Sequence, residues 1–300
     1  MINIRKLNKS FDGNPALSEF DMTVRSGSIY GLVGTNGAGK TTVLKLINGV
    51  LKADSGAVLI DGRPVYENAA VKEKIAFIPD DLTFFFPYTL ADAGRFFSEL
   101  YRDWDGGLFD EIIGRFGLDR KRKMGKFSKG IRKQAVFALS FASVPDCLIL
   151  DEPIDGLDPI VRRVVRKYIV DAAADRGMTT LISSHNLPEM EGFCDSVGVI
   201  SKGRMVLEGE LDELTTDIHK LQVSFGGPGK RPEDAYDRLD VKRLQSEGSV
   251  DHLIVRNNKE DLERFKNEKR PLLFDRLPLT LEEVFIYELG GGNDEIQDIL

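Results

Sequence analysis

A phosphate-loop pattern near the amino terminus constrains the fold of this chain more than any other feature. Residues 34–42 read GTNGAGKTT, which fits the pattern G-x-x-x-x-G-K-[ST]. The apolar run Ile29 to Val33 precedes the loop, and the helix-like segment VLKLINGV follows it. The sequence therefore predicts a strand, a tight glycine-rich turn and a helix, which is a common unit of α/β domains.

A loop of this kind is suited to bind the phosphates of a nucleotide. Its backbone N–H groups can point at the phosphates, and the positive end of the following helix adds to the attraction. We expect Lys40 to reach the terminal phosphates and the Thr41 hydroxyl to hold magnesium. The predicted nucleotide-binding residues of the loop are Gly34, Thr35, Asn36, Gly37, Ala38, Gly39, Lys40, Thr41 and Thr42. The alternative is a glycine-rich turn that caps a helix by accident.

Two adjacent carboxylates follow a short apolar run later in the chain. The segment CLILDEP predicts a buried strand that ends in Asp151 and Glu152. Buried carboxylates are costly unless their charges meet a cation, and the phosphate loop supplies a reason for one. We expect Asp151 to hold magnesium directly or through water, and Glu152 to orient or deprotonate an attacking water. An acidic turn at a strand end is the alternative.

A histidine follows the next predicted strand, which covers Thr179 to Ser183. A lone histidine is usually structural, but His185 follows a strand that we expect near the one ending in carboxylates. That position makes His185 a candidate catalytic residue.

A run of basic residues between Arg120 and Lys133 permits more than one interpretation. A solvated face is the default, and a nucleic-acid patch is the less favoured alternative because no basic segment elsewhere in the chain extends the run. The small-residue turn Ser128, Lys129 and Gly130 opens a predicted apolar helix over residues 132–143. Because the start of a helix attracts negative charge, these three residues form a second candidate anion site.

Aromatic residues at two places have an open interpretation. Phe11 lies just ahead of a predicted turn and is either a core residue or a platform on which an adenine base stacks. The cluster FFFPY at residues 84–88 is broken by proline and does not fit one buried strand well. It is either core packing or a surface on which a partner docks.

Composition bounds the organisation and location of the chain. A length of 300 residues with 42% hydrophobic content predicts one large and one small domain. The net charge of −7 argues against direct binding to nucleic acid, which requires a basic face. The only two cysteines, Cys147 and Cys194, lie in apolar segments, so we expect no disulfide and a reducing compartment. No apolar run approaches the roughly 18 residues of a membrane-spanning helix, so a location at a membrane would require a partner.

In this order the motifs resemble those of the ATP-binding subunit of an ABC transporter, over roughly residues 1–215. GTNGAGKT resembles the Walker A motif, FSKGI the signature motif, LILDEP the Walker B motif and DGLD the D-loop. His185 falls at the switch histidine and Phe11 at the adenine-stacking aromatic. Lys129 and Ile131 replace a glycine and the glutamine of the commonest signature, L-S-G-G-Q. This version resembles bacterial ATPases that serve drug, antibiotic and lantibiotic exporters.

The resemblance implies an α/β P-loop NTPase fold of the ABC ATPase type, with a mixed sheet, flanking helices and a helical insert at about residues 89–143. Residues 216–300 would form a small α+β accessory domain, for which strand-like runs and a last helix opened by Thr280 and Glu283 are the direct sequence support.

The resemblance also implies ATP and Mg²⁺ as cofactors, and two kinds of partner. Two cassettes would pair head to tail, so that Ser128, Lys129 and Gly130 of one chain, with Asp158 of the D-loop, complete the ATP site of the other. A separate transmembrane permease would hold the chain in the cytoplasm at the inner face of the membrane, and export is favoured over import. The alternatives are an ABC-type ATPase that acts on nucleic acid or ribosomes, and a non-hydrolysing regulatory module.

One position departs from the family pattern near the predicted site. Asp80 follows the predicted strand 74–78, where the family usually has glutamine. A further negative charge beside Asp151 and Glu152 is unfavourable unless it lies close to a metal. We therefore expect Asp80 to bind magnesium, with a pKa raised by its neighbours as the alternative, and Asp81 as an alternative carboxylate.

Overall fold

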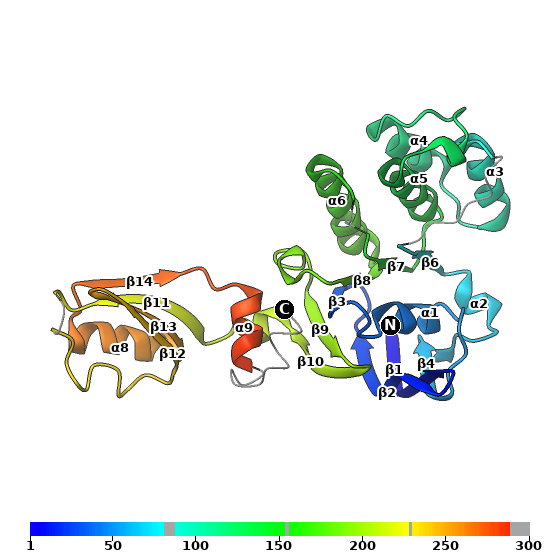
Figure 1. The fold of residues 1–300 in the computed structure, drawn as a ribbon. Coiled ribbons are helices and arrows are strands. Elements are labelled where there is room, and N and C mark those ends of the chain that lie inside the picture. The colour runs from blue at the N-terminus through cyan, green and yellow to red at the C-terminus, as the bar shows by residue number, and fades with distance from the viewer. Residues whose placement is uncertain (81–87, 154–155, 228–229, 289–300) are drawn as a thin grey trace. The chain divides into compact units, whose positions relative to one another are not determined.

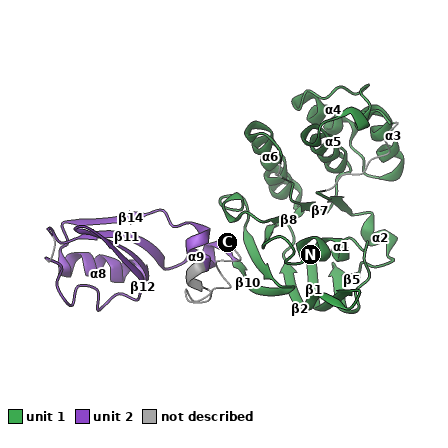
Figure 2. Ribbon diagram, in the orientation of Figure 1, with its two compact units in different colours: residues 1–209, 299–300 green, residues 210–298 purple. Residues whose placement is uncertain are grey.

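The computed structural model describes residues 1–80, 88–153, 156–227 and 230–288. Contacts within the chain define two compact units, one over Met1–Gly209 and one beginning at Glu210, which Figure 2 shows in different colours. The cluster Phe84, Phe85 and Phe86 lies outside the described residues, as do Asp81 and Asp155 of the D-loop. The predictions made for these residues therefore stay predictions.

A six-stranded sheet carries the phosphate loop in the first unit (Figure 1), with the strand order β10-β9-β3-β8-β7-β6. The bounds are β3 Ile29–Val33, β6 Ile75–Ile78, β7 Cys147–Asp151, β8 Thr179–Ser184, β9 Ser196–Ser201 and β10 Arg204–Glu210. β3 is parallel to β8 and β9, and β7 is parallel to β6 and β8. The five parallel strands are β3, β6, β7, β8 and β9. Their carboxyl ends lie at one edge of the sheet, and the site residues follow these ends.

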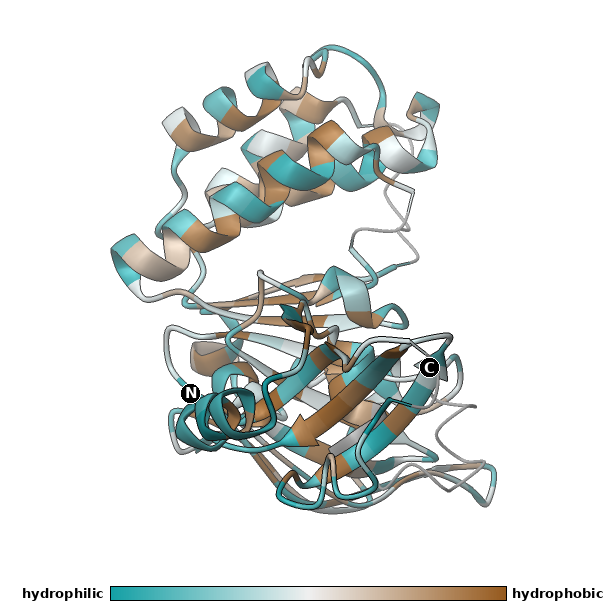
Figure 3. Ribbon diagram, turned by 90° about the vertical axis from the view of Figure 1, so that its left-hand side faces the viewer, coloured by the Kyte–Doolittle hydropathy of each residue, from teal (hydrophilic) through white to brown (hydrophobic). Residues whose placement is uncertain are grey.

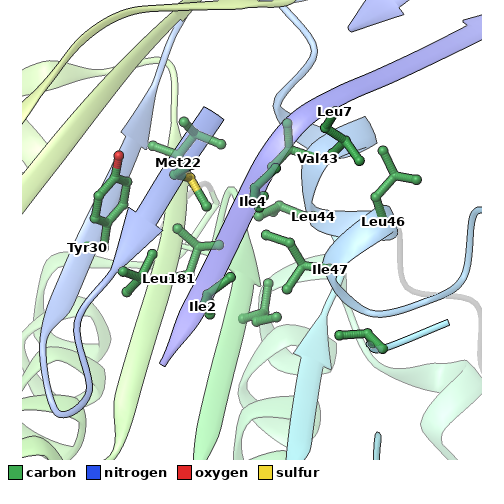
Figure 4. Close-up of a cluster of buried hydrophobic side chains, with 14 of the residues drawn as sticks. Ile2, Ile4, Leu7, Met22, Tyr30, Val43, Leu44, Leu46, Ile47 and Leu181 are labelled. Carbon is green, nitrogen blue, oxygen red and sulfur yellow. The ribbon is translucent and has the colours of Figure 1, made fainter. Parts of the chain in front are cut away.

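A four-stranded antiparallel sheet, in the order β2-β1-β4-β5, completes the sheets of the first unit. Its strands are β1 Ile2–Phe11, β2 Asn14–Val24, β4 Ser55–Ile60 and β5 Arg63–Pro64. β1 lies between β2 and β4 and is therefore an interior strand of this sheet. Side chains of this sheet, of the six-stranded sheet and of helix α1, Lys40–Ile47, form one buried apolar cluster that includes Ile4, Leu44 and Leu181 (Figure 4).

Three helices form the insert between β6 and β7. They are α3 Leu90–Leu100, α4 Gly106–Arg115 and α5 Lys129–Ala142, with a short 3-10 helix at Met124–Lys126. Hydrophobic and hydrophilic residues alternate along the helices of this unit (Figure 3). α3 opens with a capping box, in which Thr89 Oγ1 accepts from Asp92 N at 3.2 Å and Asp92 Oδ2 accepts from Thr89 N at 3.0 Å.

The remaining helices of the first unit are short α2, Ala69–Lys72, and long α6, Pro159–Arg176, with a 3-10 turn at Leu187–Glu189. Among the described residues, no helix combines the length and the apolar character needed to cross a membrane. Cys147 and Cys194 are both buried with free thiols.

The second unit is a four-stranded antiparallel sheet with the order β12-β13-β11-β14. Its elements are α7 Leu211–Thr215, β11 Ile218–Ser224, β12 Val241–Glu247, β13 Val250–Arg256, α8 Lys259–Lys269, β14 Leu273–Leu277 and α9 Leu281–Glu288. Leu221 and Leu253 of the sheet pack with Leu262 and Phe265 of α8 in a separate apolar core. The capping box that opens α9 is confirmed by hydrogen bonds between Thr280 and Glu283.

Candidate active site

The phosphate loop joins the carboxyl end of β3 to the first residue of α1, as predicted. Gly34 N donates to Ser184 O at 3.3 Å, which ties the loop to the end of the neighbouring strand. A Cβ atom on Gly34 would lie 2.3 Å from Ile200 O, so no side chain fits there. Gly37 and Gly39 have φ values of +83° and +114°, in the region that favours glycine. The glycines of the pattern are therefore required by the backbone of the loop.

Lys40 is buried at the start of α1, with 6% of its surface exposed. Its Nζ donates to Gly34 O at 2.6 Å and to Thr35 O at 3.2 Å, and lies 3.3 Å from Glu152 Oε1. The loop therefore folds around the ammonium group, and the lysine lies where the pattern predicts a phosphate contact. Its three contacts offset the cost of burying the charge.

Asp151 ends β7 and lies against the phosphate loop. Its Oδ2 accepts from Thr41 Oγ1 at 2.9 Å and its Oδ1 accepts from Ser183 Oγ at 2.6 Å. The structure thus brings together the two residues predicted from distant motifs to hold magnesium. Ser183 was not among the predicted site residues. It lies near the end of β8 and is paired with Asp151 of β7 in the sheet register.

Glu152 is held at four points by different parts of the chain. Its N donates to Ser183 Oγ at 3.1 Å, and its O accepts from Lys133 Nζ at 2.8 Å. Its Oε2 lies 3.0 Å from His185 Nδ1, and its Oε1 lies 3.3 Å from Lys40 Nζ. Its φ of 46° is left-handed, which costs a non-glycine residue about 1–2 kcal/mol. These contacts hold the residue in a conformation that it would not adopt alone.

His185 follows the last residue of β8 and has a side chain that is 44% exposed. Because an ionised carboxylate only accepts hydrogen bonds, Nδ1 of the ring is the donor in the contact with Glu152 Oε2. The sequence prediction placed the histidine and the carboxylates on adjacent strand ends, and the structure brings His185 and Glu152 into direct contact.

Asp80 lies among lysines of α5. Its Oδ1 is 2.9 Å from Lys133 Nζ and 3.5 Å from Lys129 Nζ. Partial burial raises the pKa of Asp80, but the hydrogen bond and charge of Lys133, with Lys129, outweigh burial, and the net pKa is below its usual value. The alternative that neighbours raise this pKa is therefore wrong. The magnesium role of Asp80 stays a prediction.

Phe11 and the residues predicted to face a second cassette lie apart from the phosphate loop in sequence. Phe11, at the end of β1, is 44% exposed, so it is not a core aromatic. Ser128 Oγ caps α5 by accepting from Ile131 N, and this cap is why the helix begins at Lys129 rather than at the predicted Arg132.

Gly130 and Asp158 have local partners within this chain. A Cβ atom on Gly130 would lie 2.9 Å from Gly156 O, so the signature turn lies close against the D-loop. Asp158 Oδ1 caps α6 by accepting from Ile160 N and Val161 N, at 3.0 Å each. Among the described residues, no hydrogen bond or ion pair joins Ser128, Gly130 or Asp158 to the phosphate loop.

The oxygen atoms at the end of β7 suit magnesium. The Thr41 hydroxyl and the Asp151 carboxylate are hard oxygen donors, and magnesium in nucleotide sites usually takes one or two protein oxygens together with phosphate oxygens. In residues 1–80, 88–153, 156–227 and 230–288, no group of three or more His, Cys, Asp or Glu side chains could hold a metal ion. Thr41 and Asp151 supply two protein oxygens, which fits a magnesium ion whose other ligands include phosphate oxygens.

A buried lysine inside a glycine loop, opposite two carboxylates at the end of a parallel strand, defines a P-loop nucleoside triphosphatase. Residues 17–155 match the ABC transporter family. The chain is 33% identical to the ABC transporter ATP-binding protein YtrB of Bacillus subtilis (strain 168), over 97% of this chain and 99% of that protein. The chain belongs to the family of ABC transporter ATP-binding proteins, and it is an ATP-binding ATPase of that type.

Two further comparisons agree with the family. The chain is 29% identical to the bacitracin transport ATP-binding protein BcrA of Bacillus licheniformis, over 97% of this chain and 98% of that protein. A solved structure of the ATP-binding subunit of an ABC transporter matches with a TM-score of 0.66 and 25% identity, covering 72% of this chain and 92% of the other. The α/β P-loop fold of the ABC ATPase type is thus confirmed.

Proposed function

We propose that this chain hydrolyses Mg²⁺-bound ATP at Glu152 and drives export through a separate membrane permease. The observation that carries the proposal is the placement of one carboxylate between a buried lysine and a histidine. Glu152 Oε1 lies 3.3 Å from Lys40 Nζ, and Oε2 lies 3.0 Å from His185 Nδ1. Oε1 is buried beside the Lys40 ammonium and accepts no hydrogen bond in the described residues, and we assign this carboxylate as the group that accepts a proton from an attacking water.

The roles of the other residues follow from their positions. The backbone of residues 34–42 and the Lys40 ammonium would bind the phosphates, while Thr41 and Asp151 would hold magnesium. Bound magnesium would neutralise charge on the terminal phosphates. His185 would orient the carboxylate of Glu152 and stabilise its charge.

The second part of the proposal concerns a second cassette. We expect ATP to lie between the phosphate loop of one chain and Ser128, Lys129 and Gly130 of another, with Asp158 at the same interface. The Lys129 side chain is 67% exposed, so it is accessible to such a partner. Phe11, exposed at the end of β1, would stack on the adenine base.

The third part concerns transport and location. We assign the cassette to residues 1–215 and an accessory domain to residues 216–300. A relative of nearly the same length is named for bacitracin transport, which supports a role as a transporter subunit. It also favours transport over action on nucleic acid or ribosomes. We expect the chain to lie at the cytoplasmic face of the membrane through its permease.

Copurification from membranes tests the transport assignment. The full chain with an affinity tag is expressed in its own host, membranes are solubilised in detergent, and bound proteins are identified. We expect one membrane protein with several spanning helices at a fixed ratio to the tagged chain. Recovery with ribosomes or nucleic acid, and without a membrane protein, would contradict the assignment.

A further inference from the structure

Lys133, the last residue of the basic run, is one of two buried lysines among the described residues. It is 3% exposed, and the other is Lys40 of the phosphate loop. Both contact Glu152, since Lys40 Nζ faces its carboxylate and Lys133 Nζ donates to its main-chain oxygen at 2.8 Å. Burial of an ammonium group is unfavourable unless its hydrogen bonds are satisfied, so the position of Lys133 depends on these acceptors.

The contact with the main chain of Glu152 restrains where its carboxylate points. Side chains hold both main-chain polar groups of Glu152, since Ser183 Oγ accepts from its N–H and Lys133 Nζ donates to its carbonyl oxygen. The left-handed φ of 46° makes that restraint necessary, because a residue in this region relaxes to another conformation when its contacts are lost. Loss of Lys133 would therefore change the direction of the Glu152 side chain.

The second acceptor of Lys133 lies on another segment. Asp80 Oδ1, in the loop after β6, accepts from Lys133 Nζ at 2.9 Å and supplies the compensating negative charge. Lys133 itself lies in the first turns of α5, the helix that Ser128 caps. One ammonium group therefore joins the start of α5, the loop after β6 and the residue after β7.

We propose that Lys133 is a positioning residue that holds Glu152 in the orientation required for ATP hydrolysis, with Asp80 as its counter-ion. The inference rests on the proposed role of Glu152 as the group that activates water. Because Lys133 belongs to α5, a displacement of this helix moves Glu152 through the same contact, and hydrolysis depends on where the helix lies.

The test is a set of purified full-length variants assayed for ATP affinity, KM and kcat. Lys133→Met keeps the length of the side chain and removes its charge and donors. We expect kcat to fall about 10- to 100-fold, as a small misplacement of a reacting group does, with the Kd and KM for ATP changed less than about twofold. In a Glu152→Gln background the same substitution should cause no further loss, because the oriented group is absent.

Asp80→Asn tests the counter-ion separately, on a side chain that is 43% exposed and tolerates the change. We expect a smaller loss of kcat and no added loss in Lys133→Met. In contrast to the magnesium role predicted for Asp80 from the sequence, the counter-ion role predicts an unchanged magnesium concentration for half-maximal hydrolysis. If Lys133→Met does not fold, the kinetics of Asp80→Asn decide whether the contact between Asp80 and Lys133 contributes to turnover. A normal kcat with a raised magnesium requirement would make Asp80 a metal ligand and overturn the inference.

Lys74→Met is the matched control. Lys74 pairs with Asp146 at 2.7 Å, and both side chains are more than half exposed. The two residues directly precede β6 and β7, at the ends of these strands away from the site. We expect normal kinetics in this variant. If kcat of Lys133→Met lies within about twofold of the wild-type value while Glu152→Gln is inactive, the role of Lys133 is overturned and the proposed function is not. Wild-type turnover in Glu152→Gln overturns the proposed function itself.

Discussion

Ser183 connects the two carboxylate residues of the site through a single hydroxyl group. Its Oγ donates to Asp151 Oδ1 and accepts from Glu152 N, and the residue is fully buried. A buried hydroxyl with both roles filled fixes the geometry of its neighbours more tightly than either contact alone. The positions of the predicted magnesium ligand and the predicted base are therefore coupled before any nucleotide binds.

Ser183→Ala should lower both stability and turnover. The substitution leaves the Asp151 oxygen and the Glu152 N–H without this partner, which costs about 1–3 kcal/mol for a buried group. Urea unfolding measures the first effect and steady-state kcat the second. Thr180→Val is the control on the same strand, because Thr180 Oγ1 is buried without a hydrogen-bond partner in the described residues. Equal stability of the two variants would show that the Ser183 contacts contribute little.

The elements of this chain differ in how clearly their sequence predicts them. The strands β3 and β7 are short, fully buried and largely apolar runs, as strands buried on both faces are, and the sequence predicts them almost to the residue. β8, TTLISS, is also fully buried and was predicted over Thr179 to Ser183, although only Leu181 and Ile182 in it are apolar. β12 was not predicted, because VKRLQSE is largely polar and mostly exposed. Its place in the sheet depends on pairing with β13, a long-range contact that no local pattern reveals.

The same contrast holds for the site. Lys40, Asp151 and Glu152 stand in local motifs and were identified from the sequence, whereas Lys133 and Ser183 act through partners on other segments. The missed signal for Lys133 was its spacing of four residues from Lys129, which places both lysines on one face of α5. Contacts of Ser128, Lys129 and Gly130 with nucleotide would depend on a second chain, which a single sequence does not describe.

The start of α6 provides a prediction at the scale of one element. Asp158 caps this helix through two backbone N–H groups, so Asp158→Ala should destabilise the protein by about 1 kcal/mol. Asp158→Asn keeps a capping oxygen and should retain most of that stability, which thermal and urea unfolding of both variants would show. If asparagine destabilises the protein as much as alanine, the charge rather than the cap is what matters.

At the scale of the whole molecule, the two compact units have separate cores. The apolar cluster of the first unit includes side chains of β1, β3, β7, β8 and α1, and the cluster of the second unit lies between its sheet and α8. Every residue that we place at the phosphates or at the attacking water lies before Gly209, the last residue of the first unit. Nucleotide binding should therefore be a property of the first unit.

A chain that ends after Asp217 should bind ATP with a Kd within about twofold of the full-length value, since each unit has its own core. Fluorescent nucleotide titration of the two proteins checks this expectation, and circular dichroism confirms that the shorter chain is folded. A folded, soluble truncated chain that no longer binds ATP would show that the second unit contributes to the cassette.

The role proposed for Glu152 is to activate water for ATP hydrolysis in a site that binds ATP without it. The most direct measurement compares ATP affinity and turnover in the wild-type chain and in Glu152→Gln, which keeps the size of the side chain and removes its basic oxygen. We expect an unchanged Kd for ATP and a kcat lowered at least about 100-fold. We also expect a dimer to accumulate with ATP, because the closed dimer reopens only after hydrolysis. Turnover near the wild-type rate in Glu152→Gln would contradict the claim.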